Sequence, residues 1–437
     1  MNRTFSVVLL SATGLLAPFV AAGDGAEALY RQLDSLAAGV EQKVIAWRRD
    51  LHEHPELSNR EFRTGEMVAE HLRSLGLEVR DKVAFTGVVG LLKGGKPGPV
   101  VALRADMDAL PVTEDTGLPF ASKVRSTYNG QDVGVMHACG HDSHVAILMG
   151  VAEVLASMRD QLPGSVKFLF QPAEEGSPRG EEGGAELMVK QGALENPVPD
   201  AVFGLHISSR AHLNNINYRP GGSMASSDVL KITVHGKQTH GASPWQGVDP
   251  VVISAQIILA LQTIPSRQMD ATLAPSIVTI GSIHGGVRSN IIPDKVEMIG
   301  TIRALDTGMR TDIHERIKRT ARLIAESAGA TADVEIQLGY PITYNNPELT
   351  ARMLPTLEKV AGKDHVILAQ PITGAEDFSF YAEKVPGLFF FLGATPEDVP
   401  LSEAAPHHTP KFFVDERSFL LGIRTMLHLT VDYMLGQ

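Results

Sequence analysis

The sequence predicts an α/β fold: a mixed, mostly parallel sheet flanked by helices, with a smaller α+β domain inserted into it. Apolar segments of strand length alternate with helical segments in the first half of the chain and again near its end. The pattern changes after Gly221-Gly222, where strands with alternating apolar and polar residues and two helices form a separate unit. We therefore expect residues 23–222 and 338–437 to form one discontinuous domain, and residues 223–337 to form the insertion.

Apolar periodicity and capping residues place the individual elements. Ser58 or Asn59 can cap a helix that Gly76 ends, and Asp142 or Ser143 can cap another. The helices of the larger domain are predicted at residues 42–52, 60–75, 145–158, 184–194, 349–360 and 417–434, and its strands at 87–92, 100–103, 166–170, 202–205 and 388–392. The insertion is predicted to contain strands at residues 229–234, 276–283 and 296–302, and helices at 250–264 and 310–327.

The composition is that of a folded globular protein. Hydrophobic residues make up 43% of the 437 residues and charged residues 20%, which excludes a disordered or fibrous chain. At about 150 residues per domain, this length predicts two or three domains. The formal net charge is −11 and no basic run occurs, so no nucleic acid is expected as a partner. A single cysteine, Cys139, excludes an intrachain disulfide.

The N-terminus is typical of a secretory signal peptide covering residues 1–22. Asn2-Arg3 gives a positive start, positions 5–20 are mostly apolar, and small residues suit cleavage near Ala22. The apolar run is short for a membrane span, which needs about 20 residues; an uncleaved anchor is the alternative. We therefore expect an exported protein, periplasmic or secreted, without stable membrane insertion. A free thiol in an oxidising compartment needs a reason to persist, which makes Cys139 a candidate functional residue.

Polar residues that could carry chemistry directly follow the predicted strands. Binding sites in open α/β sheets form at the carboxyl ends of the strands. The segments of this kind are residues 105–111 with Asp106 and Asp108, residues 171–176 with Glu174-Glu175, His206 after the strand at 202–205, and residues 136–144, which open a helix. A further pair, His407-His408, lies near the C-terminus.

Cys139 and His141 are suited to bind a transition metal. Residues two positions apart do not share a helical face, but Gly140 between them allows a tight, irregular turn. The turn leads into a helix N-terminus, where free N–H groups favour a thiolate. A cysteine, several histidines and two carboxylates suit Zn²⁺, Mn²⁺, Ni²⁺ or Co²⁺. The alternative is a buried apolar cysteine followed by a histidine that caps the helix.

The paired carboxylates Glu174 and Glu175 form the second feature. Two buried carboxylates repel each other unless one binds a metal ion and the other acts as a base. A solvated loop pair is the alternative, but the pair directly follows an apolar strand. His206 also follows such a strand. A lone histidine there is more often a core residue than a ligand, so its assignment depends on the other features.

Together these motifs resemble those of the metal-dependent amidohydrolases and exopeptidases related to aminoacylase, glutamate carboxypeptidase and succinyl-diaminopimelate desuccinylase. The most similar branch is that of hippurate hydrolase, bacterial N-acyl-amino-acid amidohydrolases and plant auxin-conjugate hydrolases. The resemblance spans about residues 47–433 and rests on the motifs at residues 103–111, 137–142, 171–176, 204–206, 374–378 and 408–410.

The resemblance implies a site for two divalent metal ions, Mn²⁺ or Zn²⁺, with Ni²⁺ or Co²⁺ also suitable. Its ligands would be Cys139, His141, Glu175, His206 and His408. The cysteine stands where relatives carry a bridging aspartate. His408 is chosen over His407 only because the family pattern sets the ligand two residues before Pro410. Glu174 would be the general base, and Asp108 would orient the site.

The implied activity is hydrolysis of the amide bond of an N-acyl-amino acid or short peptide. Two metal ions lower the pKa of a bound water and polarise the carbonyl, while Glu174 moves the water's proton to the leaving amine. From the inserted domain, the resemblance implies His240 as the oxyanion donor, and Asn290 and Arg303 as the groups that bind the substrate carboxylate. Without the resemblance, Arg303 would be interpreted as a surface charge.

The inserted domain would act as a lid, and in relatives it often forms the contact of a homodimer or higher homo-oligomer. Gly221-Gly222 and Gly339 are candidate hinges, or simple turns. Near His240 the sequence departs from the family pattern, with Trp245 in place of a histidine, so the preferred acyl group stays open. Two other classes of function also stay open: a cysteine amidase using Cys139, and a metal- or solute-binding protein without catalysis.

Overall fold

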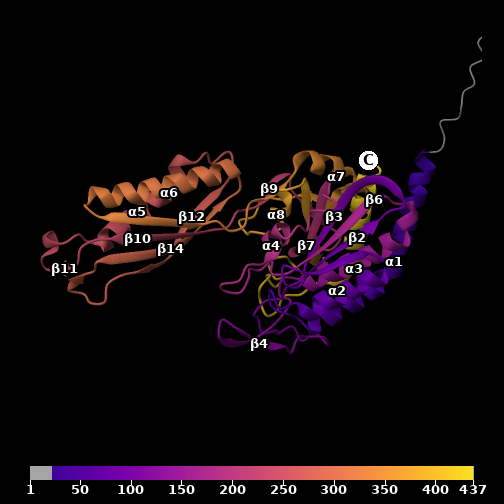
Figure 1. The fold of residues 1–437 in the computed structure, drawn as a ribbon, viewed down its shortest axis with the longest axis horizontal. Helices are drawn as coiled ribbons and strands as arrows, with labels where there is room; N and C mark the ends of the chain where they lie inside the picture. Colours follow the sequence, from indigo (N-terminus) through magenta and orange to yellow (C-terminus); the bar gives the residue numbers. More distant parts are fainter. Residues whose placement is uncertain (1–21, 437) are drawn as a thin grey trace, which may run out of the picture.

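The protein consists of a large α/β domain and a smaller domain that projects from it (Figure 1). The structure, a computed structural model, describes residues 22–436, so the predicted signal peptide lies outside the described residues except for its last position. The large domain contains an eight-stranded sheet and the small domain a four-stranded antiparallel sheet, which confirms the predicted fold class. Among the described helices, none combines the length and the apolar character that crossing a membrane requires.

The four central strands of the large sheet are parallel, and antiparallel pairing begins on either side of them. The strand order is β1-β2-β6-β3-β7-β18-β8-β17. The parallel centre consists of β6 (Pro163–Gln171), β3 (Lys96–Asp106), β7 (Ala201–His212) and β18 (Gly387–Thr395). The edges are β1 (Glu78–Val83) and β2 (Gly87–Lys93) on one side, and β8 (Ile216–Tyr218) and β17 (Val366–Leu368) on the other. Because parallel strands end at the same edge, Asp106 and Gln171 become neighbours.

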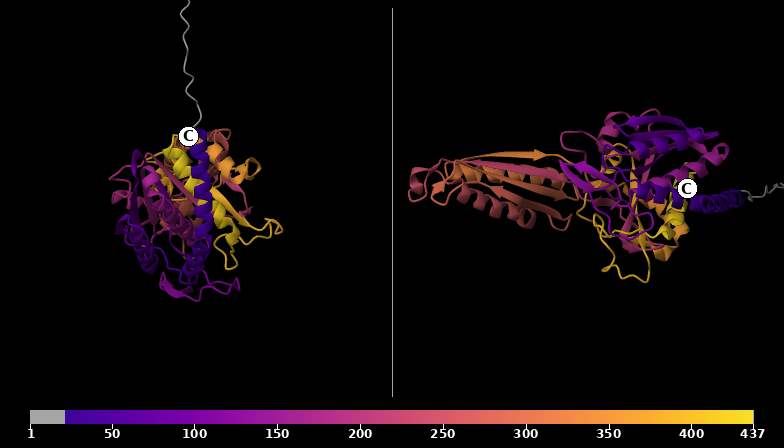
Figure 2. Two further views of the ribbon diagram at one scale, coloured as in Figure 1. Left: turned by 90° about the vertical axis from the view of Figure 1, so that its right-hand side faces the viewer. Right: turned by 90° about the horizontal axis from the view of Figure 1, so that it is seen from below.

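Helices cover both faces of this sheet, as the alternation of buried side chains requires. Leu103 and Phe168 face one layer, whereas their neighbours Ala102 and Leu169 face the other. The first layer contains α2 (Phe62–Ser74), α3 (His141–Ser157), α7 (Pro347–Ala361) and α9 (Phe419–Met434), and the second contains α4 (Gly184–Lys190) and α8 (Ser379–Ala382). The long helix α1 (Ala22–Glu53) packs outside α3 and α9 (Figure 2). This second covering explains why 14 of the 17 residues of α3 are buried.

Several element boundaries differ from the prediction. The helix predicted at residues 42–52 is the last part of α1, whose buried stripe begins at Leu33. The helix predicted from residue 145 begins at His141, because Gly140 with φ +98° forms the turn before it. The strand predicted to stop at residue 205 continues to His212, so His206 lies inside β7. Short, partly exposed strands such as β1 lack an apolar run and were not predicted.

The inserted domain is a sheet covered by helices on one face. Its strands are β12 (Ser276–His284), β14 (Lys295–Ala304), β10 (Asp228–His235) and β15 (Thr331–Gln337), in that spatial order. Alternate residues of these strands pack against α5 (Pro250–Thr263) and α6 (Thr307–Ser327). At the end remote from the large domain lies a small ribbon of β11 (Thr239–His240) and β13 (Ile291–Ile292) (Figure 1). We call this end the tip.

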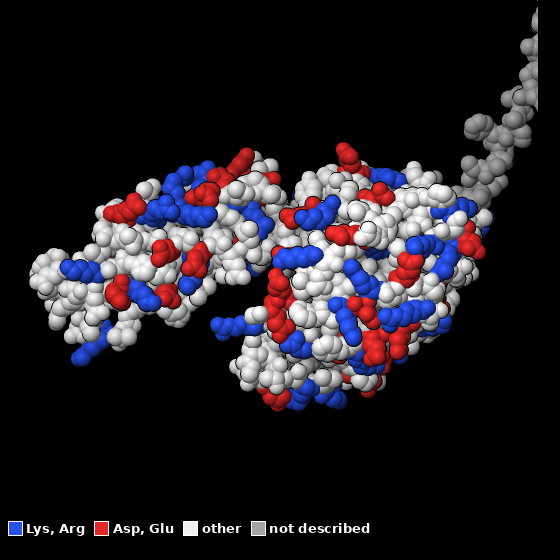
Figure 3. Space-filling model, in the orientation of Figure 1, with Lys and Arg blue, Asp and Glu red and all other residues white. Residues whose placement is uncertain are grey.

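Two further strand pairs complete the fold. β4 (Arg125–Tyr128) pairs with β5 (Gln131–Gly134), and β9 (Gly221–Met224) pairs with β16 (Thr343–Asn345) where the chain leaves and re-enters the large domain. On the face shown in Figure 3, basic and acidic side chains are interspersed over both domains.

Candidate metal centre

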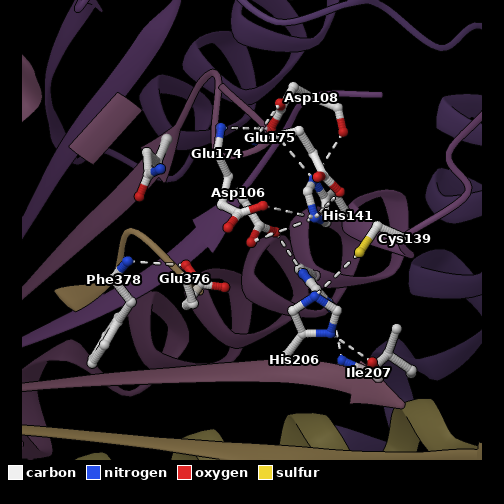
Figure 4. Close-up of polar contacts among 12 residues, drawn as sticks. Asp106, Asp108, Cys139, His141, Glu174, Glu175, His206, Ile207, Glu376 and Phe378 are labelled. Atoms are coloured by element: carbon white, nitrogen blue, oxygen red, sulfur yellow. Dashed lines mark hydrogen bonds and ion pairs between the residues drawn. The ribbon is translucent and has the colours of Figure 1, made fainter. Parts of the chain in front are cut away.

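The five predicted ligands converge at the carboxyl edge of the large sheet. Cys139 and His141 come from the turn and first residue of α3, Glu175 from the loop after β6, His206 from β7, and His408 from the loop before the last helix. Figure 4 shows the side chains of Cys139, His141, Glu175 and His206 pointing toward one another. The structure therefore brings together residues that are far apart in the chain.

These side chains form two groups that share Cys139. In one group Cys139 lies with His141 and His206, and in the other with Glu175 and His408; the ligand atoms of each group lie within 4.8 Å of one another. The Cys139 Sγ atom is 3.4 Å from Nε2 of His206 and 3.3 Å from Nε2 of His408. Oε1 of Glu175 is 3.0 Å from Nε2 of His408. The two groups could each hold a cation, and the sulfur of Cys139 would be available to both.

The turn that presents Cys139 and His141 requires glycine at position 140. Its φ of +98° lies in the left-handed region, which strains any residue with a side chain. A Cβ atom there would also lie 2.3 Å from Cγ2 of Ile207 on β7. The close approach of this turn to β7 is what brings Cys139 within reach of His206.

The ring orientations of His141 and His206 suit metal binding. Nδ1 of His141 lies 2.8 Å from the backbone oxygen of Asp108, and Nδ1 of His206 lies 2.6 Å from that of Ile207. In both rings Nδ1–H therefore donates and Nε2 faces the cluster, as is usual for metal-binding histidines. Nε2 of His141 is buried and accepts no hydrogen bond within the described residues. A cation would satisfy this atom.

The charge of the cluster also favours cations. Arg104 is buried and pairs with Asp106, Glu376 and Asp377 at 2.7, 2.8 and 2.9 Å. Burial and the charges of Glu376 and Glu175 raise the pKa of Glu174 well above its usual range. Burial alone would lower the pKa of His141, but the carboxylates of Asp106 and Asp108 outweigh this effect and raise it to about 10. Buried acids in excess of buried cations are stabilised by bound metal ions, so the donor set fits them.

Nε2 of His408 lies 3.3 Å from Sγ of Cys139 and 3.0 Å from Oε1 of Glu175, so it is closer to the cluster than His407 is. Nε2 of His407 accepts the amide hydrogen of Ser209 at 3.2 Å, and its Nδ1 lies 3.6 Å from Sγ of Cys139. His408 has φ +63°, and its N–H donates to the oxygen of Ala138 at 2.8 Å. Left-handed conformations cost a non-glycine residue about 1 kcal/mol and often mark functional positions. Both observations support His408 as the ligand.

Asp108 holds the loop that carries both glutamates. Its Oδ1 accepts the amide hydrogen of Glu174 and its Oδ2 that of Glu175, each at 3.0 Å, and Ser58 Oγ donates to it at 2.7 Å. Burial opposes ionisation, but the hydrogen bond from His141 lowers the pKa of Asp108. The structure thus places Asp108 where it can orient the site, as the resemblance implies.

Other residues of the site had no predicted role. His144 Nδ1 lies 2.5 Å from Oδ1 of Asp106, and its Nε2 accepts the amide hydrogen of Ile207 at 2.8 Å. This bridge ties β3, α3 and β7 together. Arg104 and Glu376 lie in motifs that the sequence analysis used, but their pairing joins residues 272 positions apart. Only the fold could show it.

The structure does not bring His240 and Asn290 to the metal centre of their own chain. His240 is on β11 and Asn290 precedes β13, and the amide of Gly241 donates to the oxygen of Asn290 at 2.8 Å. Both residues therefore lie at the tip, remote from the large domain (Figure 1). Arg303 lies at the opposite end of β14, one residue before the strand ends near the large domain.

Comparison with known proteins identifies the family. Residues 102–432 match the peptidase family M20/M25/M40. The chain belongs to this family. Thermostable carboxypeptidase 1 of Saccharolobus solfataricus is 43% identical over 407 residues, which cover 93% of this chain and 99% of that protein. The IAA-amino acid hydrolase ILR1-like 2 of Arabidopsis thaliana is 36% identical over 90% of this chain and 85% of its own length.

A solved M20 structure is also similar. The Bacillus subtilis protein YxeP, a dinuclear metal-binding peptidase of the M20 family, is 34% identical, with a TM-score of 0.75 over 91% of this chain and 99% of that one. The predicted family is confirmed. This M20 protein is a metallo-hydrolase that acts on amide or peptide bonds.

Proposed function

We propose that this M20 enzyme hydrolyses the amide bond of N-acyl-amino acids or short peptides at a centre of two divalent cations. The observation that carries this proposal is the convergence of one sulfur, three imidazoles and one carboxylate into two groups sharing Cys139. When bound, the cations would activate a water molecule and polarise the substrate carbonyl. Mn²⁺ or Zn²⁺ suits these donors, and Ni²⁺ or Co²⁺ is compatible with them.

Glu174 is the proposed general base. Its Oε2 lies 3.8 Å from Nε2 of His141, so its carboxylate borders the ligands without being needed in either Cys139 group. Burial and the neighbouring acids raise its pKa, which favours accepting a proton from the attacking water. The same carboxyl then donates that proton to the leaving amine.

Arg303 is the proposed partner of the substrate carboxylate. It is half-buried and forms no ion pair within the described part of the chain, while burial lowers the pKa of its guanidinium. A guanidinium without a protein partner suits bidentate binding of a carboxylate. The names of the carboxypeptidase and the amino acid conjugate hydrolase also point to substrates with an amide bond to an amino acid.

A second copy of the chain is proposed to supply His240 and Asn290. The amide of Ala242 donates to Nδ1 of His240 at 2.9 Å, which leaves Nε2–H as an exposed donor for the oxyanion. This donor lies at the tip, remote from the centre of its own chain (Figure 1). Exposed Val252 and Leu259 on α5 offer an apolar surface for a homodimer or higher homo-oligomer.

Export is proposed on the residues that precede α1. Cleavage near Ala22 would leave intact the buried stripe of α1, which begins at Leu33. The N-terminal mass of protein recovered from the periplasm or medium tests this proposal. A full-length N-terminus in a membrane fraction would contradict it.

The activity is tested by a hydrolysis screen of N-acyl-amino acids and dipeptides. Metal-stripped protein should be inactive, and Zn²⁺, Mn²⁺, Ni²⁺ or Co²⁺ added back singly should restore turnover. A cysteine amidase would keep its activity in a chelator. Burial and the charge of Glu175 raise the pKa of Cys139 well above its usual range, so without a cation beside it this thiol stays protonated and is a poor nucleophile.

A further inference from the structure

The loop that carries the two glutamates is held in place through its backbone. We call residues 172–176 the glutamate loop. Asp108 accepts the amide hydrogens of Glu174 and Glu175, and Oε1 of Glu61 accepts that of Ala173 at 2.9 Å. Ala173 has φ +53°, a conformation that strains a residue with a side chain. The surroundings therefore impose the shape of this loop.

A further hydrogen bond to the glutamate loop comes from a distant part of the chain. The hydroxyl of Tyr340 donates to the backbone oxygen of Glu174 at 2.6 Å. The Tyr340 ring packs edge-on against Phe380, with 6.1 Å between ring centroids. Burial, with the charges of Asp377 and Glu174, raises the pKa of Tyr340, so its hydroxyl keeps its proton.

Tyr340 belongs to the connection between the two domains. The chain enters the inserted domain through residues 225–228 and leaves it through residues 338–342, which we together call the junction. The two segments of the junction lie side by side, because the amide of Ser227 donates to the oxygen of Tyr340 at 3.0 Å. A Cβ atom on Gly339 would lie 2.1 Å from the oxygen of Ser227, so the approach is tight.

The junction is fastened to the inserted domain by Asp228. Its Oδ2 lies 2.9 Å from Nε of Arg310 and 2.9 Å from Nε2 of His314, both on α6. Its Oδ1 accepts the amide hydrogen of Gly339 at 3.1 Å. Since Gly339 directly precedes Tyr340, Asp228 links α6 to the segment that carries the tyrosine.

We propose that Tyr340 is a positioning residue that couples the orientation of the inserted domain to the placement of Glu174. The inference rests on the proposed role of Glu174 as the base. A displacement of the junction pulls on the carbonyl of Glu174, and the glutamate loop, already fixed by Asp108 and Glu61, has little freedom to absorb it. The side chain of Glu174 then moves relative to His141.

The test is Tyr340→Phe, which removes the hydroxyl and keeps the ring. Turnover should fall about tenfold with KM changed less than about twofold, because small displacements of a catalytic group lower kcat more than binding. Metal content should stay unchanged. Without any substrate, the backbone amides of residues 173–176 should exchange with deuterium faster than in the wild type. Tyr344→Phe is the matched control, since Tyr344 is an exposed tyrosine on β16, four residues after Tyr340.

Asp228→Asn tests the coupling from the other side of the junction without touching Tyr340. It should also lower kcat and speed amide exchange in the glutamate loop. Combined with Tyr340→Phe, it should add little, because both changes interrupt one connection. Fully additive effects would overturn the coupling.

The outcomes separate this inference from the proposed function. A wild type that cleaves none of the screened amides overturns the proposed function, and amide exchange still decides whether Tyr340 holds the loop. An active wild type whose Tyr340→Phe variant keeps its kcat and its exchange rates overturns the inference. Loss of metal, or of exchange protection throughout the large domain, would assign Tyr340 a merely structural role and would overturn it equally.

Discussion

The sulfur of Cys139 lies 3.3 Å from Nε2 of His408, although 269 positions separate the two residues in the chain. The contact joins the turn before α3 to a loop near the C-terminus. Because the same sulfur also approaches His206, replacing it should affect both groups of candidate ligands together.

Cys139→Ala should therefore lose most of the bound metal, and kcat/KM should fall by at least about 100-fold. Cys139→Asp should retain part of both, because a carboxylate can bridge two cations as a thiolate can. Elemental analysis of dialysed protein and a hydrolysis assay measure the two effects. If Cys139 were a nucleophile, the aspartate variant would be inactive at every metal loading.

Glu174→Gln should abolish most turnover while metal content survives. The amide cannot accept a proton from water, and loss of a general base costs about 10²–10⁴-fold in rate. Glu186→Gln is a suitable control, because Glu186 lies exposed on α4. Near-normal turnover in Glu174→Gln would reject it as the base.

His240→Ala and Glu174→Gln should complement each other when the two variant chains are mixed. If a second copy supplies His240, a mixed dimer has one complete centre, and random mixing restores about a quarter of the wild-type sites. Subunits are exchanged under mild dissociating conditions and assayed at once. If the mixture were as inactive as its two components, His240 would not act in the centre of a second copy.

Asp228→Asn should reduce stability in a pH-dependent way. Burial opposes ionisation, but the bonds from Arg310 and His314 lower the pKa of Asp228 from 3.8 to about 2. Because the folded protein binds this proton less tightly than the unfolded chain, the stabilisation is full above pH 3.8 and is lost as the pH falls through about 2.

At neutral pH, Asp228→Asn should lower the free energy of unfolding by about 3 kcal/mol, as for one partner removed from a buried ion pair. The difference in free energy of unfolding between the wild type and Asp228→Asn, measured by urea titration, should become smaller below pH 4. Asp312→Asn on the same helix is the control, because its pair with Arg316 is exposed and contributes about 0.5 kcal/mol or less. If this difference in stability grew on acidification, the lowered pKa assigned to Asp228 would be wrong.

The sequence predicted the parts of the centre that local pattern controls. Asp106 and Gln171 end apolar strands, and Gly140 marks a tight turn, so these positions could be inferred from neighbouring residues alone. His206 was placed at the end of a strand that continues to His212. The polar residues at 208–210 hide this continuation, which pairing with β18 stabilises.

Other features depend on how distant segments meet. The salt bridge of Arg104 with Glu376 and the bond of Tyr340 to Glu174 join segments that no local periodicity relates. The position of His240 depends on the angle between two domains, which the pattern of β11 does not encode. These features required the folded structure.

Gly140 is as important to the candidate metal centre as the candidate ligand atoms around it. A single methyl group added there would push against Ile207, whose neighbour in the chain is His206, while distorting the turn that joins Cys139 to His141. One small substitution, in a residue that has no donor atom in its side chain, would thus misplace three donors on two elements at once. The absence of a side chain at position 140 is therefore a requirement of the candidate metal centre.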